Sequence, residues 1–338
     1  MALTVPVIDL SSSSAPAQIN AAASTIGFFQ VVNHGLDPAV TDGLRDAVDA
    51  FFSLPLATKL GYPPPGPDVN NGYSAIGAES LAYSLGIDAP PDLFEAFNFG
   101  PEGFDESDPA IMAERHRIFA DNVWPAECPR LRTDGMAYFA EVTALAHRLT
   151  SACAVGLGLD EDFFESFTTH STDTLRCNWY QRAEGAPEPE PGQQRMGAHT
   201  DYGIITVLLA DSVPGLQIVG PDGGWVDVVP APGAYVINIG DLMAQWTNDR
   251  WRSTVHRVVP PPTVQDGPAL RRSYAFFHDG DWDAIVECLP TCCSDDRPAR
   301  YQPVRALDHL MNKLVGGRTS QLAEATDHIG DRLDVVRG

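Results

Sequence analysis

The sequence predicts a mainly β protein with flanking helices, whose core is a β-sandwich or a barrel. After residue 172 the pattern changes to short apolar segments that alternate with turns rich in Gly, Pro and Asp. Strands at this spacing favour a sandwich or barrel over a parallel sheet with crossover helices. The chain has 338 residues, 44% of them hydrophobic, so it can bury a large core as one elaborated domain or two fused layers. The apolar segments cover residues 175–180, 204–209, 216–219, 225–229, 234–239, 255–259 and 273–277.

The first half of the chain is expected to supply the flanking elements. Residues 5–10 predict a short opening strand, and helical patterning then continues to about Thr25. Residues 27–35 have the β-branched and aromatic density of a buried strand that ends in a turn. Residues 40–52 are amphipathic, and residues 136–157 predict a long helix with one core-facing side.

Two later segments complete the expected organisation. Residues 184–194 are polar and rich in proline, which predicts a connection that forms a mobile flap near the site. A final helix is expected over residues 305–314, where Gly316 and Gly317 end it.

Charge and cysteine usage narrow the class of protein. A formal charge of −23 disfavours nucleic acid and anionic membrane surfaces as partners. The first basic residue is Arg45, and no apolar run approaches the roughly 20 residues that span a bilayer. We therefore expect a cytoplasmic protein with free thiols. A zinc site made of Cys288, Cys292 and Cys293 is a less favoured alternative.

The residues with metal chemistry are His199, Asp201 and His256. His199 and Asp201 are two apart, so on extended backbone both side chains leave the same face. His256 must then come from another strand that folding brings alongside. Two imidazoles and one carboxylate leave open positions on a metal, which is the arrangement of non-haem Fe(II) oxygenases.

A second group of candidate residues follows His256 in the sequence and lies on a later predicted strand. It consists of Arg271, Arg272 and Ser273. Arg271 and Ser273 share a face there, while Arg272 points away. A buried arginine needs an anionic partner, because an unpaired buried charge is costly. A guanidinium and a hydroxyl together suit a dicarboxylate co-substrate.

These motifs, taken in order, resemble the isopenicillin-N-synthase-like branch of the 2-oxoglutarate- and Fe(II)-dependent dioxygenases over nearly the whole chain. The resemblance implies a double-stranded β-helix, a cupin-like jelly roll, buttressed by helices. It implies four regions in one compact unit: an N-terminal region (1–120), a helical linker with a long support helix (121–171), the catalytic jelly roll (172–282) and a C-terminal helical extension (283–338). The matching stretches are Pro6–Leu10, Gly27–Gly35, Gly72–Tyr73, 90–100, Asn178–Tyr180, His199–Gly203, Gly240–Asp241, Trp246–Asn248, His256–Val258 and Arg271 to Phe277.

The resemblance also assigns roles. His199, Asp201 and His256 would bind Fe(II), and Arg271 with Ser273 would hold 2-oxoglutarate, supported by Asn178 and Tyr180. The family's usual proline after the tyrosine is Gln181 here. The substrate would be a small organic molecule. O2 and 2-oxoglutarate would be the co-substrates of its oxidation, and succinate and CO2 would be released. The candidates for its pocket are Tyr73, Met196 and Phe277.

Several alternatives remain open at this point. An oxidase of the same fold, like isopenicillin N synthase, would use Fe(II) and O2 without 2-oxoglutarate. An ethylene-forming type of enzyme would fragment 2-oxoglutarate itself. A non-catalytic metal-binding jelly-roll protein is the alternative from another class. Hydroxylation, desaturation, cyclisation and ring expansion all use the same motif, and the oligomeric state is undetermined.

Overall fold

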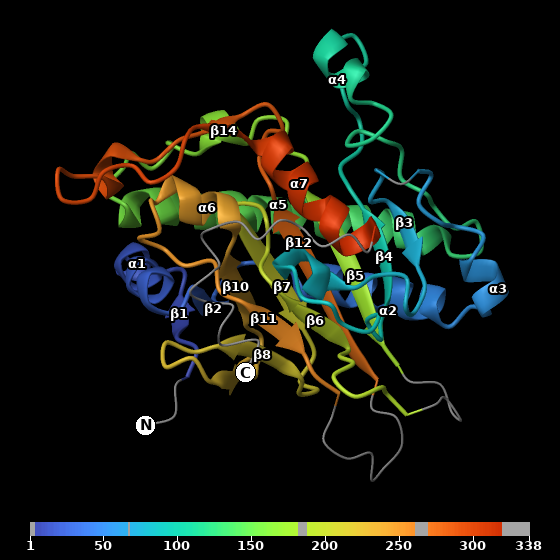
Figure 1. Cartoon of the computed structure of the whole chain (residues 1–338). Helices are drawn as coiled ribbons and strands as arrows, with labels where there is room; N and C mark the ends of the chain where they lie inside the picture. The colour runs from blue at the N-terminus through green and yellow to red at the C-terminus, as the bar shows by residue number, and fades with distance from the viewer. Residues whose placement is uncertain (1–3, 67, 182–187, 261–269, 320–338) are drawn as a thin grey trace.

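The fold is built on a large mixed sheet and a smaller antiparallel sheet (Figure 1). The computed structural model describes residues 4–66, 68–181, 188–260 and 270–319. The large sheet has eight strands, in spatial order β1 (Val7–Asp9), β2 (Phe28–Val32), β10 (Tyr235–Ile239), β7 (Ile205–Ala210), β12 (Arg271–His278), β5 (Thr174–Tyr180), β4 (Glu95–Phe99) and β3 (Gly72–Ser74). The small sheet has four strands, in the order β6 (Met196–His199), β11 (His256–Val258), β8 (Leu216–Val219) and β9 (Trp225–Asp227).

Helices cover the outer face of the large sheet. The long helix α5 (Pro129–Gly156) packs on β7 and β12, and α1 (Ala15–Thr25) and α2 (Pro38–Phe52) pack against α5. The apolar residues of these helices form one core with the outward side chains of the sheet. A second apolar cluster lies between the two sheets, as expected for the two layers of a jelly roll.

The remaining elements are short, apart from the last helix. They are α3 (Leu56–Lys59), α4 (Pro109–Ala113), α6 (Asp241–Trp246), α7 (Ala306–Thr319), the 3-10 helices η1 (Leu81–Leu85), η2 (Glu165–Phe167) and η3 (Pro290–Cys292), and the two-stranded sheet of β13 (Ile285–Val286) and β14 (Val304–Arg305). In Figure 1, α7 (red) crosses in front of one end of β5 and β12. In the part of the chain that the structure describes, no helix is long and apolar enough to span a membrane.

Most predicted elements are confirmed, but two helix boundaries are wrong: α5 begins at Pro129 and not near residue 136, and the last helix ends later than expected. The seven strands expected after residue 172 all form, within a few residues of their predicted limits. The final helix was expected to end before Gly316, but α7 continues to Thr319. A glycine inside a helix costs only about 1 kcal/mol relative to alanine, which does not end a helix by itself.

Parts of two expected segments lie outside the described residues. Residues 184–187 of the proline-rich connection and residues 320–338 of the C-terminal extension are not described. The N-terminal strands β1 and β2 join one side of the large sheet, and β3 and β4 join the other. The N-terminal region therefore shares its sheet with the strands that follow residue 172.

Candidate active site

The three expected metal ligands lie together at the small sheet. β11 pairs antiparallel with β6, and His256 is the direct cross-strand partner of His199. This confirms that His256 comes from a neighbouring strand. The register shifts between this pair and the pairing of Val258 with Met196, and such irregularities re-aim side chains next to functional sites.

The ligand atoms converge. Oδ1 of Asp201 lies 3.7 Å from Nε2 of His199 and 3.7 Å from Nε2 of His256. All three side chains are buried, and one ligand atom from each lies within 4.8 Å of the others. Among the described residues, no other group of three or more His, Cys, Asp or Glu side chains comes together in this way. Cys288, Cys292 and Cys293 therefore do not form the alternative zinc site. They are free thiols, like the other cysteines.

The hydrogen bonds around the ligands leave the correct atoms available. Nδ1 of His199 lies 2.8 Å from the Gly197 carbonyl, and Nδ1 of His256 lies 3.1 Å from the Thr254 carbonyl. A carbonyl can only accept, so each Nδ1 carries the proton and each Nε2 presents a lone pair. Burial, with a smaller contribution from neighbouring His256, lowers the pKa of His199 to about 4. The ring is therefore neutral at pH 7, which is the form that binds a metal.

Asp201 is oriented by the large sheet. Its Oδ2 accepts hydrogen bonds from the Thr206 hydroxyl at 2.5 Å and from Asn238 Nδ2 at 2.7 Å. Thr206 lies on β7 and Asn238 on β10. One carboxylate oxygen is thus fixed by two strands, and the other faces the imidazoles.

The expected co-substrate residues lie on two paired strands of the large sheet. Arg271 of β12 is the cross-strand partner of Tyr180 on β5, and Ser273 is the partner of Asn178. The Arg271 guanidinium lies 4.9 Å from the centre of the Tyr180 ring, and Asn178 Nδ2 donates to the Ser273 hydroxyl at 3.4 Å. Arg272 points to the opposite face, as predicted, and pairs with Asp49 of α2 at 2.6 Å.

Arg271 is a buried cation with unsatisfied hydrogen-bond donors. It is 2% exposed, and its Nε and Nη1 atoms have no hydrogen-bond partner among the described residues. A buried guanidinium left in this way is strongly unfavourable unless an anion binds there. The carboxylate of a co-substrate supplies that partner, with the bidentate geometry that arginine favours.

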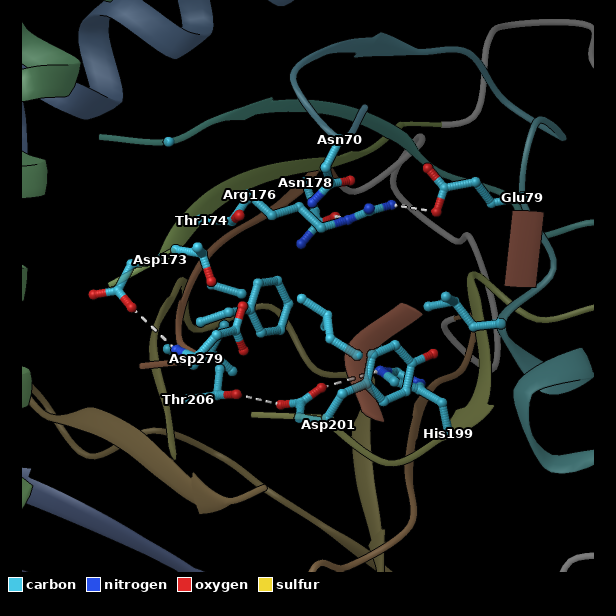
Figure 2. Close-up of a pocket in the computed structure, with 18 of the residues that line it drawn as sticks. Asn70, Glu79, Asp173, Thr174, Arg176, Asn178, His199, Asp201, Thr206 and Asp279 are labelled. Carbon is cyan, nitrogen blue, oxygen red and sulfur yellow. Dashed lines mark hydrogen bonds and ion pairs between the residues drawn. The ribbon is translucent and has the colours of Figure 1, made fainter. Parts of the chain in front are cut away.

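A cavity of about 160 Å³ joins the metal ligands to Arg271 and continues beyond both. Figure 2 shows His199, Asp201 and Thr206 on one side of it, and Asn70, Arg176 and Asn178 on the other. Met196 and Phe277, two of the three candidates for the substrate pocket, line the cavity. Tyr73 is not among the described residues that line it. Its ring packs against Phe51 in the outer core, and its hydroxyl bonds to Glu95.

Comparisons with known proteins agree with this geometry. Residues 172–280 match the model of the 2OG-Fe(II) oxygenase superfamily, and residues 5–127 match the non-haem dioxygenase in morphine synthesis N-terminal model. A 2-oxoglutarate-Fe(II) type oxidoreductase of Emericella nidulans is 34% identical over 86% of this chain and 81% of its own length. The chain belongs to the 2OG-Fe(II) oxygenase superfamily.

Two further proteins are similar to this chain over most of its length. Validamycin A dioxygenase of Streptomyces hygroscopicus subsp. limoneus is 34% identical over 92% of this chain and 86% of its own length. A Neurospora crassa protein solved in complex with alpha-KG (2-oxoglutarate) is 31% identical and superposes with a TM-score of 0.79, covering 92% of this chain and 96% of that one. The same protein was also solved with thymine. Our 2OG-Fe(II) oxygenase is accordingly an oxidoreductase with a jelly-roll core that uses Fe(II) and 2-oxoglutarate.

Sequence reasoning missed several residues of this oxygenase's site. Thr206 and Asn238 orient Asp201, and Arg176 lines the cavity beside Asn178. Two of them carried a signal. Asn238 is a polar residue inside an otherwise apolar strand, and Arg176 alternates with Asn178 and Tyr180, so all three share one face of β5. The position of Thr206 beside Asp201 depends on the fold and had no sequence signal.

Proposed function

We propose that His199, Asp201 and His256 hold Fe(II), and that Arg271 and Ser273 hold the distal carboxylate of 2-oxoglutarate. In this arrangement the enzyme oxidises a small organic molecule and releases succinate and CO2. Asn178 and Tyr180 support the co-substrate residues from the adjacent strand. The observation that carries the proposal is the buried guanidinium of Arg271, whose Nε and Nη1 have no hydrogen-bond partner among the described residues, in the same cavity as three converging metal ligands.

The donor set fits the metal and the co-substrate. Two neutral imidazoles and one carboxylate are the ligands that non-haem Fe(II) oxygenases use, and they leave positions open for other ligands. The Fe(II) site, once loaded, supplies oxidative decarboxylation of 2-oxoglutarate by O2 and the oxidising power for the substrate.

The protein's own contribution is orientation and exclusion of water. Thr206 and Asn238 fix Asp201, and the backbone carbonyls of Gly197 and Thr254 fix the two imidazoles. Buried walls around the ligands keep the reacting groups away from bulk water.

The substrate occupies the part of the cavity beyond the ligands, where Phe277 lies, whereas Met196 lines the cavity beside Tyr180. We propose hydroxylation as the default outcome, with desaturation or cyclisation as variants of the same chemistry. A cytoplasmic location remains part of the proposal, supported by the free cysteine thiols.

The proposal is tested by adding Fe(II) and then 2-oxoglutarate to the protein without oxygen. We expect a visible metal-to-ligand charge-transfer band in the wild-type protein, because 2-oxoglutarate chelates iron held at this site. His199→Ala should abolish the band. Absence of the band in the wild type, or iron binding by His199→Ala that equals the wild type, would contradict the proposal.

A further inference from the structure

Asp279 places a carboxyl group in the substrate end of the cavity. Arg271, Ser273, Ala275 and Phe277 alternate along β12 and all line the cavity, and Asp279 continues this series just after the strand ends. Figure 2 shows the Asp279 carboxylate turned toward the interior of the cavity. The strand that supplies the co-substrate clamp at one end therefore supplies an acid at the other.

This carboxyl group lies close to the metal-binding loop. Its Oδ1 lies 2.0 Å from the position that a Cβ atom at Gly203 would occupy. Because a Cβ atom would clash at this distance, only glycine at position 203 allows the acid to pack against this backbone. Gly203 lies two residues after the metal ligand Asp201. A substrate atom that bonds to Asp279 would consequently lie near the ligands.

The carboxylate of Asp279 has no hydrogen bond or ion pair with the described residues. Its backbone N–H donates to Oδ1 of Asp173 at 3.0 Å, which holds the chain but leaves the side chain free. Asp173 is itself an acid, so it does not neutralise Asp279. The nearby His278 pairs through its Nδ1 with Asp173 at 2.9 Å. Burial, and then the charge of Asp173, raise the pKa of Asp279 to about 8. A carboxyl group in these surroundings is stabilised as an anion by any cation that arrives.

The cations around the cavity already have assigned partners. Arg176 pairs with Glu79 at 2.9 Å, and Arg117 pairs with Glu114. Arg271 faces the co-substrate end. Asp279 is therefore the acid at the substrate end that has no ion pair with the described residues. Its raised pKa leaves it mostly protonated near pH 7, and a cation beside it would lower that pKa and stabilise the carboxylate.

The neighbouring walls are apolar and suit a hydrocarbon body. The apolar residues that line this end come from the segment after β4, from β12 and from α7, and they are Phe104, Ile118, Phe277, Leu310 and Met311. Aromatic faces such as Phe277 also favour a cation beside them.

We infer that Asp279 is a specificity-determining residue, and that the substrate is an organic amine whose protonated nitrogen pairs with it. This inference rests on the proposed function, because it assigns the part of the cavity that iron and 2-oxoglutarate leave free. The apolar walls hold the carbon skeleton, and the ion pair places a carbon near that nitrogen beside the metal ligands.

The test uses the anaerobic enzyme loaded with Fe(II) and 2-oxoglutarate, and a matched set of probes. Phenyl, cyclohexyl and hexyl skeletons are each supplied as the primary ammonium, the alcohol and the sulfonate. Binding is followed as a shift of the charge-transfer band. Within each skeleton that binds, we expect the ammonium to bind about tenfold more tightly than the alcohol, as one charge-assisted hydrogen bond allows.

Substitutions assign this preference to the residue. Asp279→Asn keeps the shape and removes the charge, so it should abolish the preference for the ammonium while the band itself remains. Asp283→Asn is the control, because it removes the same charge at a half-exposed position that pairs with His170. It should leave the preference unchanged.

The outcomes separate this inference from the proposed function. Absence of the band in the wild type contradicts the iron and 2-oxoglutarate assignment. A band with no ammonium bound at millimolar concentration, or with alcohols or sulfonates bound equally well, overturns the amine assignment alone. The wild-type comparison decides this even if Asp279→Asn does not fold.

Discussion

Asp201 is the residue on which the site depends most. Its two carboxylate oxygens have different partners: Oδ1 faces the two imidazoles, and Oδ2 accepts from Thr206 and Asn238. Such outer hydrogen bonds fix the orientation of a metal ligand and its basicity. The geometry of the centre is therefore set partly by residues that never touch the metal.

A substitution of Thr206 tests this dependence. Thr206→Val keeps the volume and β-propensity of the side chain but removes one hydrogen bond from Asp201. We expect the affinity for Fe(II) to fall by about 10-fold or more, since loss of such partners typically costs 10–100-fold. Anaerobic metal titration measures it.

Thr150→Val is the matched control for that experiment. Among the described residues, the Thr150 hydroxyl bonds only to backbone carbonyls of its own helix, α5, so metal affinity should not change. Equal affinity of Thr206→Val and the wild type would show that Asp201 is positioned without this bond.

At the scale of elements, α7 closes the cavity and is tied to the loop behind the metal ligands. Leu310 and Met311 of α7 line the cavity. Lys313 of the same helix pairs with Asp241 at 3.1 Å, and Asp241 in turn accepts from the Thr200 hydroxyl at 3.1 Å. Both charged side chains are nearly buried, so the pair links the C-terminal helix to the start of α6.

Lys313→Met should therefore destabilise the protein. It leaves Asp241 as a buried anion without its lysine, although Asp241 keeps the hydrogen bond from Thr200. Loss of one partner of a buried ion pair typically costs up to about 3–5 kcal/mol of the free energy of unfolding. Urea unfolding with a common m-value measures the change. The double variant Lys313→Met, Asp241→Asn removes the unpaired charge and should recover a large part of the loss. A loss for the single variant within error of zero, or no recovery in the double variant, would contradict this role of the pair.

The elements also show where prediction from sequence succeeded. Dense β-branched and aromatic segments and the long apolar stripe of α5 marked their own structure, because burial selects those residues directly. β6 was not predicted as a strand. Its residues, Met-Gly-Ala-His, have weak strand propensity, and the strand forms because β11 pairs with it.

At the scale of the whole molecule, the site lies where the two sheets meet. The histidines come from the small sheet, whereas Arg271, Ser273, Asn178 and Tyr180 come from the large one. Asp201 lies between them and is held by β7 and β10 of the large sheet. Packing of the two layers therefore sets the distance between the metal and the co-substrate clamp.

This arrangement explains how much of the site could be predicted. Residues with distinctive chemistry, such as the two histidines and Arg271, could be selected from type, order and strand alternation. Tyr73 could not be placed from sequence, because an aromatic residue beside a turn serves a core as well as a pocket. Asp279 was overlooked because its environment depends on the fold. Its side chain packs against Gly203, which lies in the connection between β6 and β7.

The central claim is that one cavity divides its work between metal ligands and an anion clamp. The most direct measurement compares Arg271→Leu with Arg272→Leu, two neighbours on opposite faces of β12, by anaerobic titration with Fe(II) and then with 2-oxoglutarate. Removal of the clamp should weaken 2-oxoglutarate binding by at least about tenfold, the contribution of a charged hydrogen-bonded pair, while iron affinity stays unchanged. Arg272→Leu should leave both affinities unchanged. Equal loss of iron and 2-oxoglutarate affinity in Arg271→Leu, or no loss of either, would contradict the account.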